Sequence, residues 1–428
     1  MPSYAAVLRT PHASRTFAAA LLGRLSYGVL PLPLVLTVKN ATGSYAAAGV
    51  VMAVFGACSV LLGPVRAGFV DRYGPRRALL PLATAYAALL LTFALVCWRP
   101  GAPTPLITLI AALTGACCPP LGPTMRVLWG RLMPDRAMLQ RAYSLDGVVE
   151  ELLFVAGPLL VGIPAVYAFP AIGVLAAAGL VLVGTAALAT SPIATHSGDG
   201  PAATGAPGKR SRTRIPGLAL PMAVAAAVGL SLGGVGLLGI AFTESHGRPE
   251  AISWVEASLV VGSAVGGLVY GAVNWRAGAR TRLLATALLL GCALAAAGFS
   301  PGVYVYAPAA AITGLFIAPA ITTAYLIADE AAGPDSRARA GAWVNAALNA
   351  GTSTGTAVVG LLVGRVPLPL CFVLVAVPVL CAAGTGFVLR SRNRGRNGNA
   401  DQSSESVPVA EPAVARSSVP SSSVPSSS

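Results

Sequence analysis

The chain has 428 residues, of which 55% are hydrophobic and only 10% are charged. Soluble domains carry about a quarter charged residues, so this composition excludes a soluble globular protein and indicates an integral membrane protein. Basic residues outnumber acidic ones by 29 to 15. Because the arginines lie between apolar runs, membrane topology explains the excess, and no nucleic-acid partner is expected.

Apolar runs long enough to cross a bilayer, which takes about 20 residues, follow one another along the chain. The predicted fold is all-α, with twelve transmembrane helices in two six-helix halves, 16–190 and 217–390. The first half is expected to span at 16–38, 45–66, 78–98, 105–128, 143–163 and 167–190, and the second at 217–242, 251–273, 282–300, 303–328, 339–364 and 367–389.

Three polar segments flank these halves. Residues 1–15 form a short N-terminus, and the first apolar run is too long and too interrupted by Arg24 for a cleavable signal, so we expect it to be retained. Residues 191–216 are rich in Gly, Pro, Ala and Thr and are expected to form a flexible linker. The Arg-rich and then Ser/Pro-rich tail, 391–428, cannot bury a core and is expected to be disordered.

Lysine and arginine are concentrated in alternate loops. Loops on one side, including the linker and tail, carry Arg9, Arg15, Arg72, Arg76, Arg77, Arg131, Arg136, Arg141, residues 209–214, Arg276, Arg280, Arg282, Arg337 and Arg339, whereas loops on the other carry only Lys39, Arg99, Arg248 and Arg365. Positively charged loops stay in the cytoplasm, so we expect a multi-pass plasma-membrane protein with both termini cytoplasmic.

The two halves also resemble each other. A shift of 198 positions places 141–162 on 339–360, so that Glu151 meets Asn349. One span earlier, a shift of 199 places Thr114, Pro120 and Thr124 on Thr313, Pro319 and Thr323. A nearly constant shift over two adjacent spans indicates an internal repeat, and two facing repeats leave a path between them.

The stretch 63–80 gathers charge and glycine between two apolar runs. It resembles the loop signature of the major facilitator superfamily, Gly-x-x-x-Asp-Arg-x-Gly-Arg-Arg, although Ala67 holds the place of the first glycine and Pro75 the place after the second. The matching places are held by Asp71, Arg72, Gly74, Arg76 and Arg77. The second half contains a weaker match to this signature. Asn274 lies near the position of the signature's Asp, and Arg276, Arg280 and Arg282 follow it.

This resemblance covers residues 15–390 and implies a transporter whose halves rock over a bracing loop, with Asp71 meeting a helix end and arginines. Asp71 also lies near the start of the predicted span 78–98, and its charge would suit the positive end of that helix. A loop that only anchors the topology is the alternative interpretation.

Ionisable groups inside spanning helices are costly and usually functional. Five of them are expected to form a polar cluster beside the path: Arg24, Arg126, Asp146, Glu150 and Glu151. Neighbouring residues on a helix point about 100° apart, so only one of the two glutamates can aim squarely at the path. Two interpretations stay open, namely carboxyls that exchange protons and a permanent ion-pair network between the helices.

Three further features bear on the path. The run 117–123 contains three prolines, so it must bend or break its helix and is a candidate lining. In the second half, polar groups in the span 339–364 are the other candidate lining: Asn345, Asn349, Thr352, Ser353 and Thr354. Gly157-Pro158 with Gly162 resembles the antiporter motif of the superfamily, without its full glycine spacing.

These features predict a secondary transporter that moves a small molecule by alternating access, with proton-coupled efflux as the first expectation. Proton-coupled uptake of a sugar or another metabolite is the alternative, and a membrane enzyme or a transport-inactive receptor is less well supported. The three histidines lie in a tail or in loops, and there is no phosphate-cradling sequence. No cofactor or metal is expected, and the partners are the substrate, protons and lipid around a monomer.

Overall fold

A computed structural model describes residues 4–98, 100–133, 135–160, 169–196, 217–333 and 336–405. Residues Met1–Gly386 form one compact unit, and the chain from Phe387 onward forms another. The described residues form helices and connecting turns and contain no strand.

The first half of the larger unit follows the predicted order of spans. The predicted span 16–38 is built from two consecutive helices, and so is 105–128. The helices are α1 (Tyr4–Arg9), α2 (Ala13–Val29), α3 (Pro31–Thr42), α4 (Tyr45–Leu61), α5 (Gly63–Val96), α6 (Thr104–Cys117), α7 (Leu121–Leu132), α8 (Arg136–Leu160), α10 (Pro170–Ala189) and α11 (Pro192–His196).

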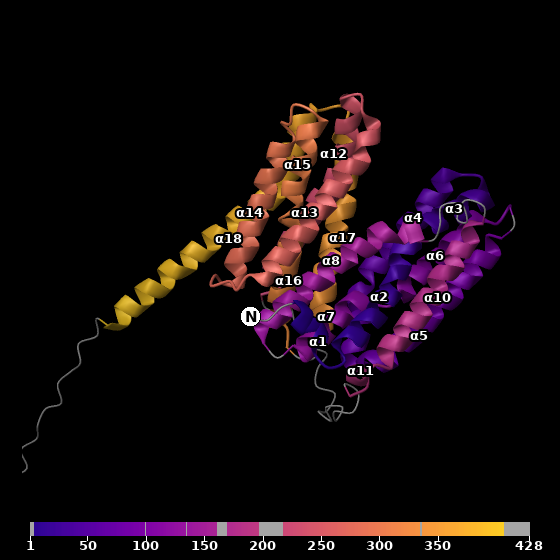
Figure 1. Cartoon of the computed structure of the whole chain (residues 1–428), viewed down its shortest axis with the longest axis horizontal. Helices are drawn as coiled ribbons and strands as arrows, with labels where there is room; N and C mark the ends of the chain where they lie inside the picture. Colours follow the sequence, from indigo (N-terminus) through magenta and orange to yellow (C-terminus); the bar gives the residue numbers. More distant parts are fainter. Residues whose placement is uncertain are drawn as a thin grey trace, which may run out of the picture. The chain divides into compact units, whose positions relative to one another are not determined.

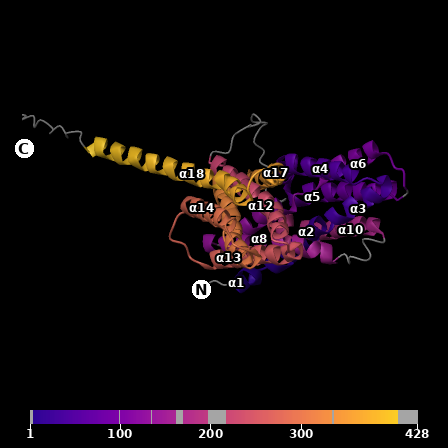
Figure 2. The ribbon, with the colours of Figure 1, turned by 90° about the horizontal axis from the view of Figure 1, so that it is seen from above.

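The second half repeats this plan, and its fourth span is again a pair of helices. Its elements are α12 (Ala219–Ser245), the short η1 (Pro249–Ala251), α13 (Ile252–Ala272), α14 (Ala279–Ala297), α15 (Val303–Gly314), α16 (Ile317–Ala331), α17 (Arg337–Leu362) and α18 (Leu368–Glu405). Figure 1 shows the first half from indigo to magenta and the second from rose to orange, each as its own bundle, and Figure 2 shows the same grouping from above.

Length and hydropathy agree with a membrane protein. Within the described part of the chain, nine helical segments are long and apolar enough to cross a membrane, and Ala47–Leu61 is a shorter apolar helix. The two remaining predicted spans are α8 and α17, which carry most of the polar residues singled out above. The prediction of an all-α membrane protein built from two similar halves is confirmed.

The helix breaks follow from glycine and proline. Gly74 adopts φ 79° and ψ 160° inside α5, a backbone conformation open to glycine, and it separates the end of the second span from the start of the third. The α6–α7 break falls on Pro119 and Pro120, as the run of prolines predicts. The equivalent α15–α16 break falls at Leu315 and Phe316.

The repeat is visible in matching hydrogen bonds. In both halves a threonine hydroxyl donates to the carbonyl one turn earlier, on either side of the helix break. The pairs are Thr114–Ile110 (2.7 Å) and Thr313–Ala309 (2.9 Å), then Thr124–Pro120 (2.8 Å) and Thr323–Pro319 (2.6 Å).

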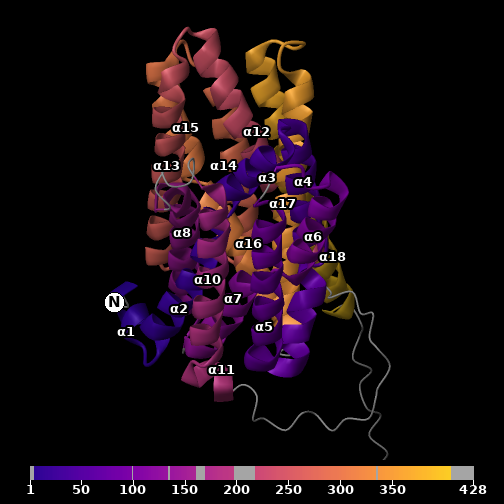
Figure 3. The ribbon, with the colours of Figure 1, turned by 90° about the vertical axis from the view of Figure 1, so that its right-hand side faces the viewer.

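Small residues set the closest packing within each half. A Cβ on Gly157 of α8 would collide with the backbone of Gly28 of α2, and one on Gly351 of α17 with the carbonyl of Ala226 of α12. In the first half α10 lies along both α2 and α5, as Figures 1 and 3 show. Gly162 of the predicted antiporter motif and residues 197–216 of the linker lie outside the described residues.

The last helix extends further than expected. α18 continues to Glu405, whereas the sequence predicts a disordered tail from residue 391. Once a helix has formed, each further residue adds one backbone hydrogen bond, so a polar sequence can prolong it. Disorder of residues 406–428, which lie outside the described part, stays a prediction.

Candidate functional site

The two halves meet at the face that bears Arg72, Arg136 and Arg276, here called the arginine-rich face. Asp71 accepts hydrogen bonds from the backbone N–H groups of Ala338 (3.0 Å) and Arg339 (2.9 Å), in the first turn of α17. These N–H groups have no partner within the helix, and the positive end of the helix dipole favours a carboxylate there.

This contact corrects one expectation. The sequence suggests that Asp71 suits the start of the span 78–98, but Gly74 turns the chain between them, and Asp71 caps α17 of the other half instead. The meeting of Asp71 with a helix end, which the family resemblance implies, is therefore a contact with α17. Arg72, Arg76 and Arg77 are exposed, and the Arg72 guanidinium lies 5.1 Å from the centre of the Tyr73 ring.

A second contact of similar placement joins the halves on the same face. Arg141 Nη2 donates to Asn274 Oδ1 (3.0 Å), and Gln140 Nε2 donates to the carbonyl of Tyr270 (2.9 Å). Arg141 and Arg339 are equivalent in the repeat, but Asn274 accepts from the Arg141 side chain, whereas Asp71 accepts from backbone N–H groups of α17. Arg282 donates to Gln140 and completes this group.

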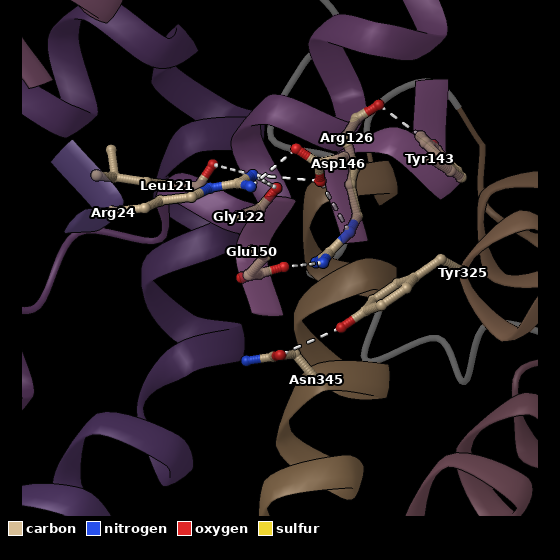
Figure 4. A network of polar contacts seen from close by, with 9 residues as sticks. All are labelled: Arg24, Leu121, Gly122, Arg126, Tyr143, Asp146, Glu150, Tyr325 and Asn345. Atoms are coloured by element: carbon tan, nitrogen blue, oxygen red, sulfur yellow. Dashed lines mark hydrogen bonds and ion pairs between the residues drawn. The ribbon is translucent and has the colours of Figure 1, made fainter. Parts of the chain in front are cut away.

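Deeper in the first half, four charged side chains form one network (Figure 4). Arg24 Nη1 lies 2.8 Å from Asp146 Oδ1, Arg126 Nε lies 3.7 Å from Asp146 Oδ2, and Arg126 Nη2 lies 2.7 Å from Glu150 Oε2. Arg24, Arg126 and Asp146 are buried. The structure thus brings together four of the five charged groups that the sequence singles out, from α2, α7 and α8.

Glu151, the fifth group, lies apart from this network. Its Oε1 accepts a hydrogen bond from Ser263 of α13 (2.9 Å), across the interface between the halves. Its Oε2 is buried and has no hydrogen-bond partner within the described residues. The side chains of Glu150 and Glu151 diverge, so one joins arginines and the other meets a hydroxyl group.

The second half contacts this charged network through neutral side chains. The Arg126 guanidinium lies 3.7 Å from the centre of the Tyr325 ring, and the Tyr325 hydroxyl donates to Asn345 Oδ1 (3.1 Å), as Figure 4 shows. Asn349 Nδ2 donates to the carbonyl of Asn345 (2.8 Å). Sequence reasoning missed Tyr325, although a shift of 199 positions places it on Arg126.

A cavity of about 390 Å³ lies between the halves. Its walls include Arg126, Glu150 and Glu151 of the first half and Asn345 and Asn349 of the second. The α6–α7 break also lines it, as expected, whereas Arg24 and Asp146 stand behind its wall. Within the described part of the chain, no three His, Cys, Asp or Glu side chains gather as metal ligands would.

The other predicted lining groups of α17 lie elsewhere. The Thr352 hydroxyl donates to its own helix, and the Thr352 backbone lies against Gly229 and Gly233 of α12. Ser353 and Thr354 are exposed on the surface of the helix. Sequence reasoning also missed Arg66, which is buried and lines the cavity. Its place near the expected loop between spans gave no sign that its side chain reaches inward.

Comparisons with known proteins agree on one family. The sequence profile of the Major Facilitator Superfamily matches residues 16–219 and again 215–423. A comparison with curated proteins finds no match.

Among solved structures, a bacterial homologue of the iron transporter ferroportin, in an outward-facing state, is similar with a TM-score of 0.71 and 14% identity, covering 88% of this chain and 99% of that one. The human organic anion transporter MFSD10 (TETRAN) reaches 0.65 with 15% identity over 90% and 100% of the two chains. The E. coli fucose:proton symporter FucP reaches 0.65 with 13% identity over 89% and 99%. At these identities the likeness concerns the fold. Because the family profile covers both halves, the chain belongs to the Major Facilitator Superfamily and is a multi-pass secondary transporter, not an enzyme.

Proposed function

We propose that this transporter exports a small organic molecule in exchange for protons, and that Glu151 carries the proton. The observation behind this proposal is that the three acidic side chains of α8 differ in their partners. Asp146 and Glu150 are paired with arginines, whereas Glu151 faces a serine hydroxyl and has no cationic partner among the described residues. A buried carboxylate without a cation is costly in a membrane protein, and binding a proton removes that charge.

The surroundings of Glu151 support this division of roles. On α8 its neighbour Glu150 is held by Arg126 of α7, and Arg24 of α2 is held by Asp146. From α13 the facing polar group is the Ser263 hydroxyl, and α16 presents Tyr325 to the same cavity. The two arginines are therefore engaged elsewhere. Asp146, Glu150, Arg24 and Arg126 are assigned a structural role, as a network that holds α2, α7 and α8 together.

The position of Glu151 can couple its protonation to movement of the two halves. Its bond to Ser263 spans the α8–α13 interface between the halves. If the halves part at the arginine-rich face, this bond breaks and the carboxyl gains access to water on that side. In the proposed topology the arginine-rich face is cytoplasmic, and the protein is a monomer in the plasma membrane. Because the halves are in contact at this face, we take the state described here to be outward-facing. Asp71 on α17 then acts as a brace of the closed cytoplasmic side.

The cavity wall bears on the substrate. It is mostly apolar, with side chains such as Leu30, Phe55 and Phe154 beside the polar groups, which suits an amphipathic organic molecule. Uptake of a sugar or another polar metabolite is the second candidate. Asn345, Asn349 and Tyr325 favour it, because sugars are held by several hydrogen-bonding side chains.

The direction is tested with a deletion strain, compared with its parent for drug sensitivity and for growth on single nutrients, with and without an uncoupler. If the protein is an exporter, the deletion strain should be hypersensitive to at least one compound. Treating the parent strain with the uncoupler should produce the same hypersensitivity. A growth defect on one nutrient without any drug phenotype would favour uptake instead.

The proton role is tested with the transported compound in proteoliposomes. Glu151→Gln should keep substrate exchange at equal pH while losing accumulation driven by a pH gradient. Glu256→Gln, which changes an exposed carboxyl of α13, is the matched control and should retain both. If Glu151→Gln accumulates as much substrate as the wild type under a pH gradient, Glu151 is not the proton carrier.

A further inference from the structure

The break between α6 and α7 leaves carbonyl groups without their helical donors. Pro119 and Pro120 have no N–H, so the carbonyls of Gly115 and Ala116, four residues earlier, lose their normal partners. Arg66 replaces both donors, because its Nη1 donates to the carbonyl of Gly115 and to that of Ala116 (3.0 Å). Its Nη2 donates to the carbonyl of Ser59. Arg66 thus caps the broken end of α6.

The cap leaves positive charge at the cavity. The carboxyl end of a helix carries about half a negative charge, so α6 offsets only part of the guanidinium charge. Within the described residues no carboxylate pairs with Arg66, whereas the charges of Arg24, Arg126, Asp146 and Glu150 balance one another. Arg66 is 5% exposed and lines the cavity between the halves.

Two buried donors in this corner also have no acceptor. Arg66 Nε and the hydroxyl of Tyr86 make no hydrogen bond within the described residues, and Tyr86 is 0% exposed. Both residues line the same cavity, together with Tyr27, whose hydroxyl is already used by the carbonyl of Pro119 (2.5 Å). A buried donor left unsatisfied is costly, so two of them, one on the unbalanced cation itself, call for an acceptor with negative charge.

We propose that Arg66 and Tyr86 form a subsite that binds the anionic group, a carboxylate or sulfonate, of the transported substrate. The subsite deepens the proposed function by naming the substrate class, and it rests on that proposal only in taking the cavity as the substrate path. A role for Arg66 as a helix cap alone accounts for its Nη atoms. It does not account for Tyr86, which donates to none of the freed carbonyls.

The test uses the full-length protein in nanodiscs of phosphatidylcholine, so that no anionic lipid headgroup competes. Benzoate and benzenesulfonate are the probes, and benzamide and benzylamine are matched neutral and cationic compounds. Binding is followed by thermal stabilisation and by equilibrium titration. We expect the two anions to bind at least tenfold more tightly than the other two. If addition of phosphatidylglycerol abolishes benzoate binding, the subsite binds a lipid headgroup and the proposal is overturned.

The decisive variant is Tyr86→Phe, because it removes one hydroxyl that makes no internal hydrogen bond and should leave the fold intact. A hydrogen bond to a charged group contributes about 1.5–3 kcal/mol, so benzoate binding should weaken about tenfold or more. Tyr306→Phe is the control, since Tyr306 is also buried with an unpartnered hydroxyl but is not among the residues that line the cavity. It should bind benzoate like the wild type. Arg66→Lys should keep a cation but lose the bonds to the α6 carbonyls, so we expect a lower unfolding temperature as well as weaker binding.

Equal binding of anionic and neutral probes, or unchanged benzoate affinity in Tyr86→Phe, would overturn the subsite. The proposed function fails separately. Transport of a neutral or cationic compound that depends on Glu151, without anion preference, would sink the subsite and leave the function. Benzoate binding that depends on Tyr86, in a protein that moves no protons, would support the subsite and contradict the proposed function.

Discussion

α7 and α8 of the first half and α16 and α17 of the second occupy equivalent places in the repeat but differ in chemistry. Arg126 corresponds to Tyr325, Asp146 to Val344 and Glu151 to Asn349. The buried ion pairs lie inside the first half, whereas its contacts with α16 and α17 are made to an aromatic ring, to backbone N–H groups and through an exposed ion pair between Arg136 and Glu330.

Because of this difference, the two regions should not move with equal ease. Separating a buried ion pair leaves an uncompensated charge, which costs several kcal/mol. A helix cap or a cation–π contact is cheaper to break, because water can replace the partner once the interface opens. The first half should therefore move as one body, and the interface between the halves should open and close.

The largest effect is expected when the ion-pair network is broken. Asp146→Asn leaves Arg24 without its carboxylate and should lower the free energy of unfolding by about 3–5 kcal/mol. Val344→Ala, at the equivalent buried position, should cost only about 2 kcal/mol. Thermal or chemical unfolding in detergent measures both. A loss in Asp146→Asn no larger than in Val344→Ala would remove the distinction between the halves.

An intermediate effect is expected at the arginine-rich face. Asp71→Asn removes the charge of the cap on α17 and replaces one of its two accepting oxygens with an amide nitrogen, which should shift the balance away from the closed face by about 1–2 kcal/mol. Distances between spin labels on the exposed positions 76 and 280 would report that shift. Asn274→Ala removes a single bond from Arg141 and should shift it less. A larger shift in Asn274→Ala would reverse the ranking of the two contacts.

The smallest effect is expected when Tyr325 loses only its hydroxyl. Tyr325→Phe loses the hydrogen bond to Asn345 but keeps the ring under Arg126, which should cost about 0.5–1.5 kcal/mol of stability. Tyr325→Leu also loses the cation–π contact and should cost about 1–2 kcal/mol more. The two variants are compared by thermal unfolding. Equal losses would show that the stacking of Arg126 contributes nothing.

Much of the architecture could be predicted from local features. The spans follow from the length of apolar runs, and the break at Pro119 and Pro120 from missing N–H groups. The candidate site could be predicted only in part. Charges at Arg24, Arg126, Asp146 and Glu150 stand out in an apolar sequence, whereas Arg66 and Tyr86 look like ordinary residues near a loop and in an apolar span.

The membrane location, the repeat and the family follow from the amino-acid sequence alone, because they depend on composition and on the order of residues along the chain. The partners of the polar side chains follow only from the packing of the helices. Asp71 meets residues 267 and 268 positions away, which no local pattern specifies. The packing of α8 against α13 decided that Glu151 faces Ser263 while Glu150 faces Arg126. These choices depend on how each helix is rotated about its axis, and only its neighbours set that rotation.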